Sequence, residues 1–138
     1  MKGVFVTGSN TGVGKTTVAI EIVRHLSQTR DVKVRKPVET NCELSEQNYI
    51  PKDAVALSAA CQQQETLKKV CPYCFEIEAS AEMASTESGE KLILEDLVLA
   101  CKCDIDESFV VVEGAGGLYS PIAEAALKIG RASCRARV

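Results

Sequence analysis

The residues best suited to chemistry lie in a glycine-rich stretch near the start of the 138-residue chain. From Gly8 to Thr16 the sequence reads GSNTGVGKT, in which glycines let backbone N–H groups turn toward an anion. Lys15 is placed to reach the β- and γ-phosphates of a nucleotide, and the Thr16 hydroxyl is placed to coordinate Mg²⁺. The spacing, G-x5-G-K-T, departs from the usual motif by one residue. This segment therefore predicts a phosphate-binding loop.

Three further charged residues suit the same chemistry. Lys36 follows an alternating segment and precedes Pro37, so it is expected near the carboxyl end of a strand, where it would be a second cation for charge that develops during transfer. Asp53 and Glu113 carry carboxylates that can complete Mg²⁺ coordination beside phosphate oxygens. Asp53 is equally explained as a favourable charge at a helix start, whereas Glu113 ends an apolar segment and needs a partner.

The cysteines and the single histidine are given no role. An odd number of cysteines, seven, in a chain without an export signal favours reduced thiols. Cys71-Pro-Tyr-Cys74 and Cys101-Lys-Cys103 are not expected to bind zinc, because the first lacks a second C-x2-C and the second is too tightly spaced. A thioredoxin-type role for CPYC is disfavoured because no N-terminal strand of that fold precedes it. His25 belongs to the polar face of a helix.

The elements that must position these groups alternate between strands and helices. Residues 2–8 (KGVFVTG) and 31–38 (DVKVRKPV) predict two strands, and their order around a helix implies a parallel pair with a right-handed crossover. Residues 108–114 (SFVVVEG) predict a central strand buried on both faces, which leads into the glycine-rich GAGG. The apolar stripe of the first helix comprises Val18, Ala19, Ile22, Val23 and Leu26.

The middle of the chain predicts mainly helices. Residues 53–63 suit a helix that packs on the sheet, and residues 92–100 suit another amphipathic helix. Residues 76–88 are acidic and rich in helix formers, whereas residues 70–75 are short and interrupted by proline. Together these patterns predict one α/β domain.

Composition bounds the class of protein. With 46% apolar and 25% charged residues the chain is of ordinary globular type, and 4% aromatics without tryptophan argue against base-stacking surfaces. No segment has the length of a membrane span and no signal peptide begins the chain, so a cytoplasmic protein without a nucleic-acid or membrane partner is expected. The domain is assigned to residues 1–127. Residues 128–138 are basic and without acids; a short nucleic-acid arm and a helix extension are alternatives to the favoured interpretation, a non-native tail.

Four segments in order resemble the dethiobiotin synthetases: GSNTGVGKTT, RKPVET, PKDAVAL and VVVEGAGGLYSPI. The resemblance covers about residues 1–122, and the G-x5-G-K-T spacing is itself typical of that family. It implies a P-loop NTPase-like three-layer fold with a mainly parallel sheet, of which the C-terminal part is missing. The acidic segment after CPYCF lacks the prolines usual in the family, so substrate contacts there are expected to differ.

The resemblance implies an ATP-dependent ring-forming carbon–nitrogen ligase of biotin biosynthesis. 7,8-Diaminononanoate would react with CO₂ to give a carbamate, whose oxygen attacks the γ-phosphate of MgATP. The second amine would capture the resulting anhydride and give dethiobiotin, ADP and phosphate. ATP and Mg²⁺ are the implied cofactors, the diamine and CO₂ or bicarbonate the small-molecule partners, and a homodimer the expected state of the complete protein. Such chemistry needs positioning and cations more than a strong base.

Site roles carry over onto matching positions. Lys15 and Lys36 would stabilise the carbamate and the transferring phosphoryl group, while Thr11, Lys36 and Thr40 would contact the diamine or its carbamate. Mg²⁺ would be held by Thr16, Asp53 and Glu113. The nucleotide would be held by Gly12, Val13, Gly14, Lys15, Thr16, Thr17, Asp53, Glu113, Gly114, Ala115 and Gly116.

Two alternatives to an active ligase remain open. One is a switch-type P-loop ATPase of the partitioning or metal-insertion kind. Such proteins often have a lysine early in the loop, and Ser9 at that position in this chain counts against this alternative. An inactive fragment of the ligase is compatible with every motif. A related amide-forming synthase acting on a larger cobalamin precursor would need further domains that 138 residues cannot hold.

Overall fold

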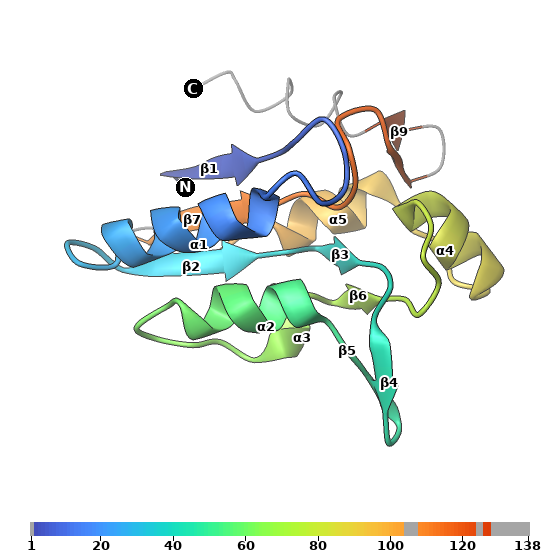
Figure 1. Cartoon of the computed structure of the whole chain (residues 1–138), viewed down its shortest axis with the longest axis horizontal. Coiled ribbons are helices and arrows are strands. Elements are labelled where there is room, and N and C mark those ends of the chain that lie inside the picture. The colour runs from blue at the N-terminus through green and yellow to red at the C-terminus, as the bar shows by residue number, and fades with distance from the viewer. Residues whose placement is uncertain (1, 104–107, 124–125, 128–138) are drawn as a thin grey trace.

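The computed structural model describes residues 2–103, 108–123 and 126–127 (Figure 1). The helices are α1 (Lys15–Leu26), α2 (Lys52–Ala59), α3 (Leu67–Val70), α4 (Ala81–Glu87) and α5 (Leu94–Ala100). The strands are β1 (Lys2–Val6), β2 (Val32–Arg35), β3 (Val38–Glu39), β4 (Glu43–Ser45), β5 (Asn48–Ile50), β6 (Tyr73–Cys74), β7 (Phe109–Glu113), β8 (Pro121–Ala123) and β9 (Ala126–Leu127).

The central sheet has three parallel strands in the order β1-β7-β2. Val111 of β7 lies opposite Val4 of β1 on one side and Val34 of β2 on the other. The prediction of a buried central strand is confirmed, because Val110, Val111 and Val112 are at most 3% exposed. The prediction that the first two strands pair directly is wrong, since β7 lies between them. Residues 109–112 of β7 are all apolar and offer no polar face to water, so this strand takes the position with neighbours on both sides.

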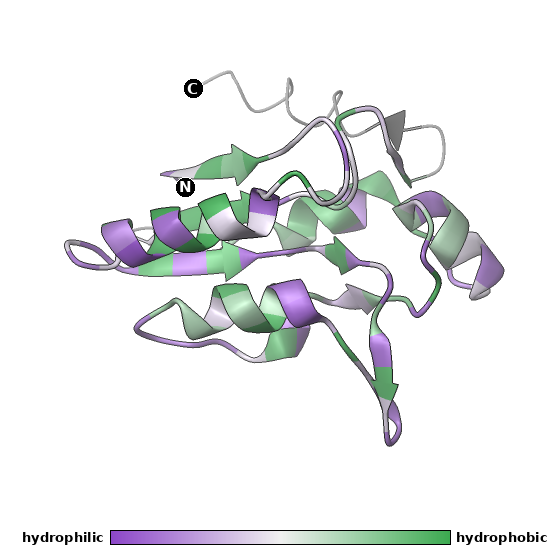
Figure 2. Ribbon diagram, in the orientation of Figure 1, coloured by the Kyte–Doolittle hydropathy of each residue, from purple (hydrophilic) through white to green (hydrophobic). Residues whose placement is uncertain are grey.

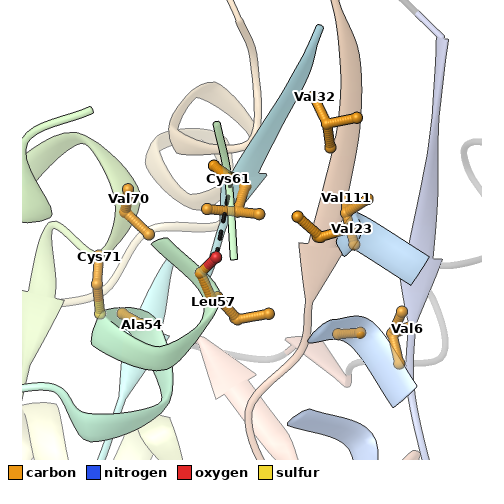
Figure 3. Close-up of a cluster of buried hydrophobic side chains, with 11 residues drawn as sticks. Val6, Val23, Val32, Ala54, Leu57, Cys61, Val70, Cys71 and Val111 are labelled. Atoms are coloured by element: carbon orange, nitrogen blue, oxygen red, sulfur yellow. Dashed lines mark hydrogen bonds between the residues drawn. The ribbon is translucent and has the colours of Figure 1, made fainter. Parts of the chain in front are cut away.

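Helices cover both faces of this sheet, which gives three layers (Figure 1). On the face toward the viewer, α1 and α2 pack on β2 and β7, and their contact forms the cluster in Figure 3. Ala19 and Val23 are fully buried there. Val18, expected in the same stripe, is 54% exposed, because one residue is about 100° round a helix and the buried face is centred on Ala19 and Val23. On the far face, Val110 and Val112 pack against Cys101, at the end of α5.

A second core lies beyond the carboxyl end of β2. Val38 of β3 packs with Phe75, with Leu97 of α5 and with residues of α4 and β8. The short strands β3 and β6 pair in parallel and fix the segment that follows Lys36. Figure 2 shows β2 with alternating hydrophobic and hydrophilic residues, in agreement with its sequence VKVR.

The predicted helices are present with different ends. The helix expected over 53–63 spans 52–59, and that expected over 92–100 spans 94–100. Within the acidic stretch 76–88 only 81–87 is helical, and the proline-interrupted stretch contains α3's last residue and β6. The exposed hairpin of β4 and β5, which projects from the body in Figure 1, was not predicted. No helix in the described part of the chain is long and apolar enough to cross a membrane.

Candidate nucleotide-binding site

A cavity of about 670 Å³ opens where β1, β2 and β7 end and α1 begins. Most of the predicted site residues line it, although they come from four separate stretches of sequence. Val13 and Gly114 do not line it: Val13 is 52% exposed, and Gly114 is buried where its N–H donates to the Val6 carbonyl over 3.1 Å. The predicted residues that do line it are Thr11, Gly12, Gly14, Lys15, Thr16, Thr17, Lys36, Thr40, Asp53, Glu113, Ala115 and Gly116.

The loop before α1 has the backbone of an anion cradle. Gly12 and Gly14 have φ of 76° and 93°, a left-handed conformation that side chains disfavour. Gly14 is the N-cap of α1, so the free N–H groups and partial positive charge of the helix start lie at the cavity. Open space surrounds both glycines where a Cβ would stand, whereas a Cβ on Gly8 would meet Val13 at 2.5 Å. The loop is thus closely packed at Gly8 and has free space at Gly12 and Gly14.

Lys15 is folded back onto its own loop. Its Nζ donates to the Asn10 carbonyl over 2.7 Å, and the residue is 8% exposed. Burial lowers the pKa of Lys15, and the nearby charge of Lys36 lowers it further. A cation in this state gains from an anionic partner, which is what a phosphate in the cradle would supply.

Lys36 and Glu113 form the buried centre of the site. The Lys36 Nζ lies 2.6 Å from Oε1 of Glu113 and 3.0 Å from Oδ2 of Asp53. The Thr16 hydroxyl donates to the same Glu113 Oε1 over 3.0 Å. Burial by itself would lower the pKa of Lys36, but the carboxylates of Glu113 and Asp53 outweigh it and raise that pKa. The structure therefore brings Thr16, Lys36, Asp53 and Glu113 together at one end of the cavity.

Oxygen atoms suited to Mg²⁺ are present in this cluster. Glu113 Oε2 is buried and has no hydrogen-bond partner among the described residues, an arrangement that costs free energy unless something binds there. No group of three or more His, Cys, Asp or Glu side chains in those parts of the chain could hold a metal by itself. The carboxylates of Glu113 and Asp53 and the Thr16 hydroxyl fit an ion that takes its remaining oxygens from phosphate and water.

Glu39 belongs to the site, and the sequence analysis did not identify it. It is 6% exposed, and its two carboxylate oxygens accept the N–H groups of Asp53 and Ala54 over 2.9 and 3.0 Å. Glu39 thus caps the start of α2 and fixes the backbone of Asp53. Burial raises the pKa of Glu39, against the two N–H groups, which lower it. An acid three residues after Lys36 was the only available sequence signal.

The glycine-rich loop after β7 forms another wall of the cavity, next to the phosphate-binding loop. A Cβ on Gly117 would lie 2.6 Å from the Ser9 carbonyl, so only glycine lets this loop approach the phosphate-binding loop so closely. Gly116 has a φ of 63°, and the Gly117 N–H donates to Ser120 Oγ over 2.8 Å. Ser120 and residues 78–81 also line the cavity and were not predicted.

The loop, the parallel sheet and the acid at the end of β7 define a P-loop NTPase-like protein. The chain belongs to the AAA domain family, since a family model of that description matches residues 2–132. This confirms the predicted fold class.

The chain is also similar to individual proteins that share one name. The chain is 55% identical over 127 residues to a protein of Ruthia magnifica subsp. Calyptogena magnifica named ATP-dependent dethiobiotin synthetase, and this match covers 92% of the chain and 58% of the relative. It is 51% identical to the protein of that name in Vesicomyosocius okutanii subsp. Calyptogena okutanii, covering 89% of the chain and 56% of the relative. A third, from Rhodopirellula baltica, is 36% identical. The chain spans little more than half the length of its first two relatives, and the resemblance seen in its motifs is confirmed.

Proposed function

We propose that this chain is the nucleotide-binding part of an ATP-dependent ligase of biotin biosynthesis. The observation that carries the proposal is the buried cluster of Thr16, Lys36 and Glu113 beside a glycine cradle, in a chain 55% identical to a named dethiobiotin synthetase. Its substrates would be 7,8-diaminononanoate, CO₂ or bicarbonate, and ATP. Its products would be dethiobiotin, ADP and phosphate.

The roles of the residues follow from where they lie. Gly12, Gly14 and the start of α1 would hold the phosphates, with Thr17, Ala115 and Gly116 at the edges of the same cavity. Lys15 would exchange its bond to the Asn10 carbonyl for a phosphate oxygen. Lys36 would face charge that develops on the carbamate and the transferring phosphoryl group, where a fixed cation lowers the barrier. Thr11 and Thr40 would hydrogen-bond the diamine.

Mg²⁺ would be held by Thr16, Asp53 and Glu113, and when bound it would neutralise charge on the phosphate oxygens. Lys36 already contacts the carboxylates of Asp53 and Glu113. When Mg²⁺ binds these carboxylates, the Lys36 side chain would shift within the cluster and the two carboxylates would stay where they are. Glu39 would be a positioning residue, because it acts on Asp53 through the first turn of α2.

Three broader expectations belong to the same proposal. The working protein would be a cytoplasmic homodimer without nucleic-acid or membrane partners. In this chain residues 1–127 would form an incomplete P-loop nucleotide-binding domain, and residues 128–138, which lie outside the described residues, would be a non-native tail. The homodimer would complete the site for the diamine.

The test is ADP release by this chain with MgATP and bicarbonate, with and without 7,8-diaminononanoate. Release that requires the diamine supports the ligase, and Lys15→Ala should then reduce it by about 10² to 10³-fold, the cost of removing one preorganised donor. Release independent of the diamine would replace the proposal with a switch-type ATPase. No release, with ATP bound, would assign the chain to an inactive portion of the ligase.

A further inference from the structure

Two thiols in the CPYC segment lie in contact beneath the site. Cys71 Sγ and Cys74 Sγ are 3.7 Å apart, and the Cys74 thiol also lies 3.5 Å from the Cys71 carbonyl. Cys71 is 3% exposed, whereas Cys74 is half-buried. All cysteines within the described ranges are free thiols. This pair therefore joins a protected sulfur to one that a small molecule can reach.

Secondary structure fixes the position of both cysteines. Cys71 ends α3 as its C-cap, and Cys74 lies in β6, where it pairs with Glu39 of β3. Only Pro72 and Tyr73 separate them, and the Tyr73 N–H donates to the Pro37 carbonyl over 3.3 Å. The two sulfurs are thus held together by elements that are themselves hydrogen-bonded, without a bridge.

We propose that Cys71 and Cys74 form a reversible disulfide by exchange with a low-molecular-weight disulfide. The Cys74 thiolate attacks one sulfur of that molecule, its S–S bond breaks, and one small thiolate leaves. Cys71 then gives up its proton and attacks Cys74 of the mixed disulfide, which releases the second small thiolate. Two protein thiols and one small disulfide thereby become one protein disulfide and two small thiols. The chain loses two electrons and two protons, and the small molecule gains them.

The surroundings favour Cys74 as the attacking group. Its hydrogen bond with Cys71 lowers the pKa of Cys74, and the same hydrogen bond, followed by burial, raises the pKa of Cys71. Cys42 also interacts with Cys74, but burial raises the pKa of Cys42 to about 12, and burial raises that of the more distant Cys61 to about 11. Since the thiolate is the reactive form, the accessible cysteine of the pair is also the one best able to start exchange.

This chemistry differs from the thioredoxin-type role that the sequence disfavours. An oxidoreductase must present its pair to another protein, usually at a helix start, whereas Cys71 lies at the end of a helix. An internal disulfide requires only that the sulfurs meet, and the structure supplies that proximity.

A disulfide between Cys71 and Cys74 would affect the segment from Lys36 to Glu39, which lines the nucleotide-binding cavity. The Lys36 N–H donates to the Val70 carbonyl over 2.8 Å, directly before Cys71, and the Phe75 N–H donates to the Glu39 carbonyl over 3.0 Å, directly after Cys74. A disulfide shortens the sulfur separation to about 2.05 Å and therefore stiffens the segment between these two hydrogen bonds. The inference does not depend on the proposed function, because the bond can be detected without activity.

The test places the full chain in mixtures of reduced and oxidised glutathione, blocks free thiols by alkylation and maps tryptic peptides by mass. Cys71 and Cys74 fall on peptide 70–91, while Cys42 falls on 36–52 and Cys61 on 53–68. We expect peptide 70–91 to lose the mass of two hydrogens, at about tenfold higher occupancy than a disulfide at any other cysteine.

Variants separate the bridge from nonspecific oxidation. Cys42→Ser should leave the bridge intact, and Cys71→Ser should convert it to a glutathione adduct on Cys74. If Cys71→Ser fails to fold, the map of the unaltered chain decides alone. Peptide 70–91 alkylated at both cysteines in fully oxidised glutathione would overturn the proposal, and so would a crosslink from Cys74 to peptide 36–52.

Discussion

Arg35 and Lys36 are neighbours in the sequence, and both are 3% exposed, yet their surroundings differ. The Arg35 guanidinium is surrounded by acceptors: Nη1 donates to the Val34 carbonyl, the two Nη atoms bind the two oxygens of Glu65, and Nε donates to the Lys102 carbonyl over 3.2 Å. It ties β2 to the loop before α3 and to the end of α5. Its environment is complete.

Lys36 lies in an incomplete environment. Its partner Glu113 keeps one buried oxygen without a hydrogen bond among the described residues, and both residues line the open cavity. A buried charge is costly unless paired, so a network left partly unsatisfied in a stable core points to a bound partner. A buried charge is therefore not, by itself, evidence of a binding site. What distinguishes the two cations is whether the network around each is closed.

Of the two neighbouring cations, Lys36 should have the larger effect on activity when it is replaced. Lys36→Ala is expected to lower kcat for diamine-dependent ADP release by about 10²-fold while the Kd for ATP changes only a few-fold, because the cation acts on charge that develops after binding. Lys33→Ala is the matched control, since Lys33 is also a buried cation but lies within β2 and pairs with Asp31 at the opposite end of that strand. A fully active Lys36→Ala variant would contradict the role.

Replacing Arg35 should affect stability and leave turnover almost unchanged. Arg35→Lys keeps the charge but loses the two-pronged contact with Glu65, and we expect the free energy of unfolding to fall by about 1–3 kcal/mol. Urea denaturation measures the loss, and ATP titration provides the control. A fall in kcat without a fall in stability would erase the contrast between the two cations.

Glu39→Gln is expected to have a smaller effect. The glutamine amide offers one acceptor oxygen where the carboxylate offers two, so one of the N–H groups of Asp53 and Ala54 loses its partner and Asp53 is less firmly placed. The concentration of Mg²⁺ for half-maximal turnover should rise about fivefold, comparable to the roughly 1 kcal/mol contributed by a helix cap. Glu43→Gln is the matched control, because Glu43 is exposed and pairs with Lys52 on the surface. An unchanged Mg²⁺ dependence would remove Glu39 from the site.

The smallest effect concerns pH, and it separates the two networks. Burial would raise the pKa of Glu65, but the hydrogen bond and charge of Arg35 outweigh it and lower that pKa, so this stabilisation is present above about pH 4.5 and is lost as pH falls through the folded value. The pKa of Lys36 is raised from 10.5, so its stabilisation is present below that pH and is lost as pH rises through the folded value. Thermal unfolding should therefore become less acid-sensitive in Arg35→Lys and less alkali-sensitive in Lys36→Ala. The reverse pattern would contradict both assignments.

The parts of the site that could be predicted from the sequence are those that depend on residues close together in the chain. The phosphate-binding loop, the apolar strand that ends at Glu113 and the lysine before Pro37 each follow from a few adjacent residues. Glu39 escaped prediction because its partners are backbone N–H groups 14 and 15 residues away, whose position depends on where α2 begins. The direct pairing of the first two strands was a wrong prediction for a related reason, since it depended on a strand more than 70 residues later in the chain.

The place of β7 between β1 and β2 also governs how the protein folds. Both earlier strands hydrogen-bond to β7, which ends at Glu113, so these three strands cannot form their sheet until residue 113 has left the ribosome. Until then, β1 and β2 lack the strand that pairs with both of them, and unpaired strand edges favour aggregation and chaperone binding. Pairing over such sequence separations also slows folding, because the entropy of closing a long loop is lost before any contact compensates it. The glycine loop follows β1 directly, so although it is made early, its cradle should take shape only after β7 has joined β1.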